Sequence, residues 1–201
     1  MIDADFDSHD REHVSLLHKI APISFVAIAC AMGSWVFDPL AGAFTYNQWI
    51  SALYIPAGIK VIAMLALGVS ATVGIFFGTL AWNIFGTHTQ IGLALIFATM
   101  TAASCYASYC VIKISLHGRG RYQWLPFSLS QTFLLVLLYS CINAGLHHLF
   151  FAVSATGGGL TLTSYFTMVF GDVAGALSLY VCLNLATAGW LEFVRWWHLR
   201  A

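Results

Sequence analysis

The sequence predicts an all-α, polytopic integral membrane helix bundle of six segments, or of five if Ile55–Gly86 forms one helix. Of its 201 residues, 60% are hydrophobic and 8% are charged, whereas soluble domains carry about 25% charged residues. Three long runs contain no Asp, Glu, Lys or Arg: Val61–Ile112, Tyr122–Gly171 and Val173–Leu191. Because about 20 apolar helical residues span a bilayer, each run is long enough for one or two membrane helices.

The polar residues divide the chain into three regions. We expect residues 1–19 to form a polar tail with a short interfacial helix from about Asp10. Residues 20–190 are expected to form the transmembrane bundle, and 191–201 a basic, aromatic cytoplasmic tail. The start of the chain lacks the basic residues and cleavage site of a signal peptide, so the first span is expected to direct insertion.

The first span is expected at Ile20–Phe37, an apolar run that Asp38 and Pro39 end. A loop over Ala41–Ser51 then leads to the second apolar run.

The second run, Ile55–Gly86, is long for one span and short for two, and Lys60 is its only charged residue. Pro56 suits a helix start, since it has no N–H to donate and its φ is fixed. We expect two short segments that fold back on each other, with a break near the middle at Gly68, Ser70 or Gly74.

The last three segments are expected at Gln90–Leu116, Pro126–Val153 and Thr161–Trp190. The polar turn Thr87–Thr89 precedes them, and the Gly-rich turn Ser154–Gly159 separates the last two. Small residues in the first of the three favour close helix approach, so it is expected to be central.

Basic residues predict the orientation in the membrane. A basic loop (Lys113, His117, Arg119 and Arg121) and the basic C-terminal tail are expected in the cytoplasm. Six segments then place the N-terminus there too, whereas five place it outside. We expect a multi-pass protein of the bacterial inner membrane with a cytoplasmic C-terminus.

The sharpest candidate site is Lys60 with Asp172, because charges inside a membrane usually line a cavity and mark a functional site. We expect a buried ion pair that lines an outward-facing ligand pocket. The alternative is that the two residues only fix helix packing. Asn143 and His147 lie four residues apart, on one helix face, and are expected to join Asp172 in binding a polar ligand. Trp82 and Asn83 complete the predicted ligand-binding set.

Other chemistry is less favoured. A haem or chlorophyll ligated by His147 or His148 stays an alternative, although we expect no cofactor. No metal-ligand spacing, nucleophile–base pair or paired carboxylates occur, so we expect no metal site, no catalytic residues and no enzymatic activity. The net charge of zero gives no nucleic-acid footprint.

Three stretches carry a resemblance to a known family. They are YIPAGIKVIAMLALG, FFGTLAWNIFG and FGDVAGALSLYVCLNLA, in that order. They resemble the motifs of the MASE1 membrane-associated sensory domain family, at Pro56, Ala57, Gly58 and Gly68, at Phe77, Gly78 and Asn83, and at Gly171, Asp172 and Gly175. Separately, the spacing of Gly74 and Gly78 predicts a close helix crossing.

The resemblance implies a membrane input domain that senses an undefined signal and is usually joined to a histidine kinase or a cyclic-dinucleotide enzyme. No such output domain is recognised in this chain. We therefore expect a non-enzymatic sensory or ligand-binding module that acts through a partner protein or as a homo-oligomer. Two alternatives stay open: a substrate-binding subunit of an energy-coupling-factor-type transporter, and an accessory subunit of a large respiratory, photosynthetic or motility complex.

Overall fold

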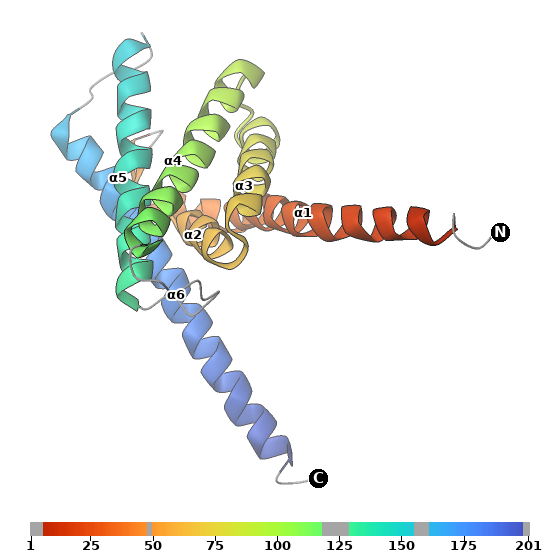
Figure 1. The fold of residues 1–201 in the computed structure, drawn as a ribbon. Helices are drawn as coiled ribbons and strands as arrows, with labels where there is room; N and C mark the ends of the chain where they lie inside the picture. The colour runs from red at the N-terminus through yellow and green to blue at the C-terminus, as the bar shows by residue number, and fades with distance from the viewer. Residues whose placement is uncertain (1–5, 48–49, 118–128, 155–160, 199–201) are drawn as a thin grey trace.

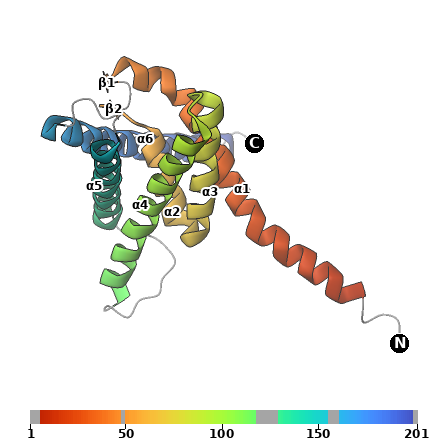
Figure 2. The same cartoon turned by 90° about the horizontal axis from the view of Figure 1, so that it is seen from above.

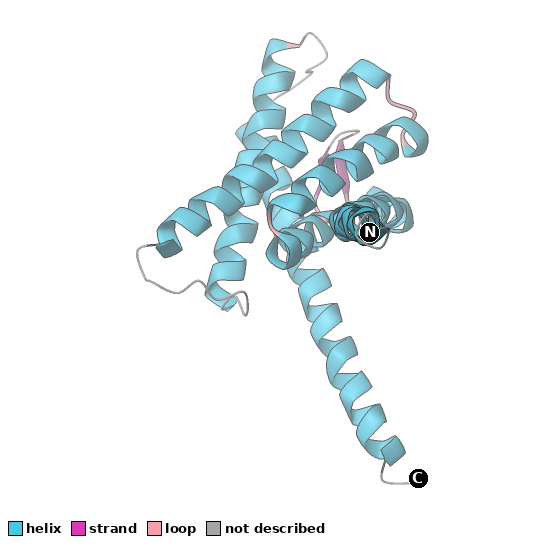
Figure 3. Cartoon of the chain, turned by 45° about the vertical axis from the view of Figure 1, so that its right-hand side comes forward, coloured by secondary structure: helices cyan, strands magenta, loops and turns pink. Residues whose placement is uncertain are grey.

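The computed structural model describes residues 6–47, 50–117, 129–154 and 161–198 (Figure 1). It confirms the predicted all-α bundle. The helices are α1 (Phe6–Ala43), α2 (Pro56–Leu67), α3 (Val69–Ala81), α4 (Ile91–His117), α5 (Leu129–Val153) and α6 (Leu162–His198). A π-helical turn, η1 (Trp82–Gly86), continues α3. Two short antiparallel strands, β1 (Thr45–Asn47) and β2 (Ile50–Ser51), follow α1 (Figure 3).

Within the described ranges, five helical stretches are long and apolar enough to cross a membrane, so the chain is a multi-pass membrane protein. They are Ile20–Leu40, Val69–Gly86, Ile91–Ser115, Ser130–Val153 and Leu162–Trp190. The apolar helix α2 is shorter. Its 12 residues extend about 18 Å, well short of a hydrocarbon core of about 30 Å.

Ile55–Gly86 therefore divides into two helices, as predicted, but they are not two short membrane spans. The break falls at Gly68, whose φ of 57° lies in a region that glycine adopts readily. Only the second half, α3 with η1, is long enough to span a membrane alone.

Two predicted helix boundaries are wrong. The first helix is continuous from Phe6 to Ala43, without a separate interfacial helix and without an end at Asp38 and Pro39. In apolar surroundings a helix keeps its backbone groups bonded internally, and a proline within it is tolerated. The last helix likewise continues past Trp190 to His198.

The short helix α2 lies at the centre of the bundle. The neighbours α1, α3, α4, α5 and α6 contact one another in that order, and α2 contacts all five (Figure 2). Its Ala57, Val61 and Met64 are at most 2% exposed and belong to the hydrophobic core. The stretch with a charge in the middle of an apolar run is thus the one around which the others pack.

Residue pairs between helices give their relative directions. A Cβ added at Gly74 would lie 2.6 Å from Ile23 O and one at Gly78 2.7 Å from Cys30 Cβ, so α1 and α3 run the same way. Gly33 of α1 lies against Ile59 of α2. Thr72 Oγ1 of α3 lies 3.5 Å from Met64 Sδ of α2 across the turn at Gly68, so α2 runs opposite to α3 and therefore opposite to α1.

The remaining helices continue this alternation. His148 contacts Ser164 and Asn143 contacts Asp172, so α5 and α6 are antiparallel. Phe97 packs on Phe151, which places the start of α4 beside the end of α5. Consecutive helices therefore alternate in direction from α1 to α6.

The glycines of the third quoted stretch lie where the chain before α2 crosses α6. The N–H of Tyr54 donates to Gly171 O at 3.0 Å. A Cβ at Gly171 would collide with Ser51 O, and one at Gly175 would lie 2.6 Å from Ile55 N. Gly58 similarly leaves 2.9 Å between an added Cβ and Ala176 Cα. Two stretches more than a hundred residues apart therefore pack backbone against backbone.

This contact explains how non-helical chain is accommodated beside membrane helices. Backbone polar groups at membrane depth must be satisfied within the protein. Besides the Tyr54–Gly171 bond, Ala52 N–H donates to Phe44 O and Ala57 N–H donates to Tyr54 O. The extended segment can therefore lie against α6, and it sets where α2 begins.

Candidate functional site

Lys60 is buried at the centre of the bundle with only 3% of its surface exposed. Its ammonium group donates one long hydrogen bond, 3.5 Å, to the hydroxyl of Tyr54. The ammonium also lies 5.0 Å from the centre of the Tyr54 ring, close enough for a cation–π attraction. An ammonium group carries three donors, so this surrounding satisfies Lys60 only in part.

Asp172, 2% exposed, lies on α6 and accepts a hydrogen bond of 3.0 Å from Asn143 Nδ2. The expected contact between Asp172 and Lys60 is absent from the described residues, so the predicted ion pair is wrong. The two charges interact electrostatically without direct contact. The backbone explains this arrangement. Tyr54, whose N–H donates to Gly171 O of α6, accepts the hydrogen bond from Lys60, and Asn143 of α5 donates to the carboxylate of Asp172.

Two further polar groups at this place lack partners in the described part of the chain. They are the hydroxyl of Tyr139 and Oδ1 of Asn143. Both residues are buried, at 1% and 3% exposure, and they lie one turn apart on α5. Tyr139 also interacts electrostatically with Asp172 and Tyr54. We call Tyr54, Lys60, Tyr139, Asn143 and Asp172 the central polar cluster.

The central polar cluster has unused hydrogen-bonding capacity of both kinds. Lys60 has donors to spare, Asn143 Oδ1 is an unused acceptor, and the Tyr139 hydroxyl can act as either. A lone anion would be repelled by Asp172 and a lone cation by Lys60. The arrangement suits a small molecule, water included, that offers both donors and acceptors.

His147 lies beside the cluster, half-buried, with its ring stacked on Phe97 at 5.6 Å between ring centres. Its Nδ1 lies 2.9 Å from Asn143 O. A carbonyl only accepts, so Nδ1 carries the proton and Nε2 of the neutral ring keeps its lone pair. In His148, Nδ1 contacts Ala144 O and Nε2 contacts Ser164 Oγ. A cofactor ligand would therefore have to be Nε2 of His147.

Trp82 and Asn83 lie elsewhere. Both belong to η1, which contacts α1, α3 and α4. Nδ2 of Asn83 and Oγ1 of Thr79, one turn earlier, are buried and have no partner among the described residues. Among the described residues, the hydrogen bonds of the central polar cluster do not include Trp82 or Asn83. The six residues predicted to form one site therefore lie in two places.

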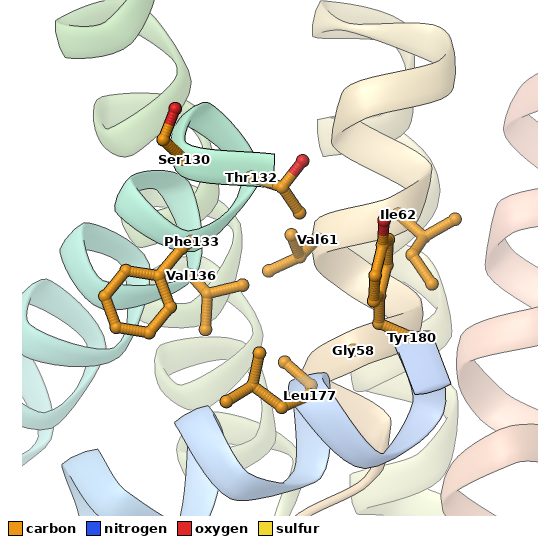
Figure 4. Close-up of a pocket in the computed structure, with 10 residues that line it drawn as sticks. Gly58, Val61, Ile62, Ser130, Thr132, Phe133, Val136, Leu177 and Tyr180 are labelled. Atoms are coloured by element: carbon orange, nitrogen blue, oxygen red, sulfur yellow. The ribbon is translucent and has the colours of Figure 1, made fainter. Parts of the chain in front are cut away.

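A cavity of about 380 Å³ lies between α2, α5 and α6 (Figure 4). It is not the predicted polar pocket. Its α2 wall consists of Gly58, Val61 and Ile62. With 3.6 residues per turn, Lys60 lies about 160° around the helix from Gly58 and Ile62. The cavity therefore lies on the side of α2 away from Lys60, while on α5 and α6 its Val136 and Ala176 lie one turn from Tyr139 and Asp172 of the cluster.

Comparison with protein-family models, curated proteins and solved structures gives no significant match to this chain. The site has to be interpreted from its own geometry.

Two members of the cluster were not among the predicted site residues. Tyr139 lies four residues before Asn143, so the face that identified Asn143 and His147 also contained it. Tyr54 carries no such signal, because only its hydrogen bond to α6 turns it toward Lys60. Cys30 and Cys105, both at most 2% exposed, also lie within electrostatic reach of Lys60.

Proposed function

We propose that this protein is a non-enzymatic sensory or ligand-binding membrane module whose ligand site is the central polar cluster. One observation carries the proposal: Lys60 and Asp172 are both buried inside a membrane bundle and interact electrostatically, yet each is hydrogen-bonded to a neutral partner and not to the other. The unpartnered Tyr139 hydroxyl and Asn143 Oδ1 beside them give a ligand further groups to bind.

The energetics support a binding role over a purely structural one. Ionisable residues inside a membrane are costly, by about 2.5–3.5 kcal/mol each on insertion scales, and generally mark functional sites. A pair kept only for packing would be expected in direct contact, since contact offsets the loss of hydration. A small polar ligand bound among them would complete the hydrogen bonds of the Lys60 ammonium, the Asp172 carboxylate, the Tyr139 hydroxyl and the amide of Asn143.

The position of the cluster supports signalling by helix movement. Its residues lie on α2, α5, α6 and the segment that connects β2 to α2, and α2 contacts every other helix. The C-terminal half of α6 extends away from the other helices (Figure 1). Binding that draws Lys60 toward Asp172 would shift α6 against α2, and a partner protein could detect the movement there. The resemblance to the MASE1 family is consistent with this role.

The test is recovery of polar small molecules that purify with the protein. We compare wild type with Lys60→Met and Asp172→Asn, and use Lys113→Met, an exposed lysine on α4, as the matched control. Each protein is extracted in lipid nanodiscs, checked for a monodisperse profile, and its bound polar molecules are identified by mass spectrometry. We expect at least one molecule that wild type and Lys113→Met retain and that both cluster variants lose. The same bound molecules in all four proteins would contradict the proposal.

A solute-binding transporter subunit is the second candidate, and the shortness of α2 favours it. Many transporters bind their substrate near the membrane midplane, at helices interrupted by non-helical chain. Here α2 follows an extended segment and has a lysine in its second turn. Co-purification of an ATPase from the native membrane would favour a transporter, whereas a signalling protein would favour the sensor.

An accessory role in a larger complex is the third candidate. Residues 181–190 of α6 are all exposed, and among them Leu185 and Trp190 are 68% and 65% exposed. A visible absorption spectrum of the purified protein separates this candidate: a haem or pigment band would indicate ligation by His147. In each case we propose a bacterial inner-membrane location with a cytoplasmic C-terminus.

A further inference from the structure

The cavity on the far side of α2 has walls that differ from those of the central polar cluster. The buried residues Gly58, Val61, Val136 and Ala176 form its inner wall. Gly58 and Ala176 leave space because they have little or no side chain. Its volume of about 380 Å³ is within the range of about 300–1,000 Å³ that ligand sites usually have.

Polar groups occur at one end only. Figure 4 shows the hydroxyls of Ser130, Thr132 and Tyr180 directed toward the same end, while Val136 and Leu177 lie toward the other. Ser130 is the first residue of a membrane-spanning stretch, which places this end near the lipid–water boundary. Tyr180 lies 18 residues after Leu162, or about 27 Å along α6, and so near the same boundary.

The cavity opens sideways, between α5 and α6. Phe133 and Leu177 line it and are 46% and 36% exposed. In a multi-pass membrane protein, exposed apolar residues of two adjacent spans face acyl chains. An apolar molecule in the bilayer can therefore reach Val61 without passing through water.

We propose that this cavity binds one acyl chain of a membrane lipid, with the lipid headgroup at the end marked by Ser130, Thr132 and Tyr180. A chain with a polar head and an apolar tail matches both the position and the polarity of the lining. A helix of a second copy does not fit, because an α-helix with side chains is about 10–12 Å wide and even one turn of it is larger than a cavity of about 380 Å³.

The site goes beyond the proposed function, because it lies across α2 from Lys60 and does not use the central polar cluster. The two sites share α2, α5 and α6 but have no residue in common. A bound acyl chain would support the wall formed by Gly58 and Val61, and so the position of the helix that carries Lys60.

The test uses phosphatidylglycerol with a photoactivatable diazirine in its acyl chain, incorporated into nanodiscs with the full chain. After irradiation, labelled residues are mapped by mass spectrometry. We expect labelling of Val61 and Val136, which are 2% and 3% exposed. Lipid that stays outside the cavity does not reach these two residues. Leu177→Trp narrows the opening and should lower labelling of Val61 at least threefold.

The matched control is Leu183→Trp, further along α6 at a residue that is 45% exposed and does not line the cavity. It should leave labelling of Val61 unchanged. Phe133→Ala widens the opening and should raise the labelling of Val61. This second variant keeps the test valid if Leu177→Trp does not fold. Label only on exposed residues such as Phe25 and Trp35 would overturn the proposal, as would equal labelling in all variants. A disulfide between two copies of Leu177→Cys in a cysteine-free background would also overturn it, in favour of a dimer.

Discussion

At the residue scale, Lys60 and Asp172 show why burial alone does not predict pairing. Each is almost completely buried, and each has found a neutral partner: the Tyr54 hydroxyl for the lysine and the Asn143 amide for the carboxylate. Neutral partners stabilise a buried charge less than an opposite charge in contact. The remaining capacity of these groups is what makes the place a candidate site.

We predict that Lys60 and Asp172 are energetically coupled although they are not in direct contact. Asp172→Leu should lower the free energy of unfolding by roughly 1–3 kcal/mol, because it leaves the Asn143 amide buried without its acceptor. The double variant with Lys60→Met should be less destabilised than the sum of the single variants. Denaturant unfolding in detergent measures the free energy of unfolding of wild type, the two single variants and the double variant. Additive effects would mean that the two residues act independently.

We predict a contrasting result for Tyr139→Phe. The Tyr139 hydroxyl has no partner among the described residues, so its removal should leave the stability of the ligand-free protein unchanged or increase it by up to about 1 kcal/mol. If the hydroxyl contacts the ligand, the same variant should retain less of the co-purifying molecule than wild type. Thermal unfolding and the mass-spectrometric recovery are the two readouts. A destabilised variant would point to a hydrogen bond that holds the fold together.

At the scale of the elements, the contact between α6 and the chain before α2 decides where Lys60 lies. The extended segment passes over Gly171 and Gly175 and is bonded to the helix through Tyr54. If a side chain pushed this segment away, the start of α2 and the lysine in its second turn would move with it.

We therefore predict that Gly175→Ala destabilises the fold by roughly 1–3 kcal/mol, because the new methyl group would meet the backbone of Tyr54 and Ile55. The matched control is Gly189→Ala in the same helix, where an added Cβ would have no atom within 4 Å apart from the helix's own nearby backbone. It should be neutral or slightly stabilising, since alanine favours a helix over glycine by about 1 kcal/mol. Thermal stability in detergent measures both; equal effects would argue that the Gly175 contact is unimportant.

At the scale of the whole molecule, consecutive helices alternate in direction, although only five described helical stretches are long enough to span a membrane. Residues 50–55 and α2 together connect the C-terminal end of α1, on one side of the bundle, to the start of α3 on the other side. One crossing would thus be made by extended chain and a short helix, covered by α6 and the other helices.

This predicts that the N-terminal end of α1 and the C-terminal end of α6 lie on the same side of the membrane, and that the turn at His88 lies on the other. Single cysteines introduced at Ser8, His88 and Arg200 in a cysteine-free background can be labelled from each side of sealed vesicles. We expect the first and third to react from one side and the second from the opposite side. Reaction of Ser8→Cys and Arg200→Cys from opposite sides would indicate five crossings.

The class of the fold and the approximate positions of the helices could be predicted from the amino-acid sequence. Charge-free runs of fifty residues leave few alternatives to membrane helices, and Gly68 permits the reversal between α2 and α3. Helix ends were less predictable at α1 and α6, because an apolar helix continues past a proline or an aromatic residue when no competing hydrogen bond ends it.

Which polar groups contact one another depends on how the helices pack, and the sequence did not predict it. Lys60 and Asp172 were both recognisable as charges in apolar runs, but their separation depends on Tyr54, which a backbone bond to Gly171 holds in place. Asn83 carried the same signal as Asn143 and lies with Thr79 instead. Helical periodicity specifies which residues share a face; which helix that face meets is set by close backbone packing between segments far apart in the chain.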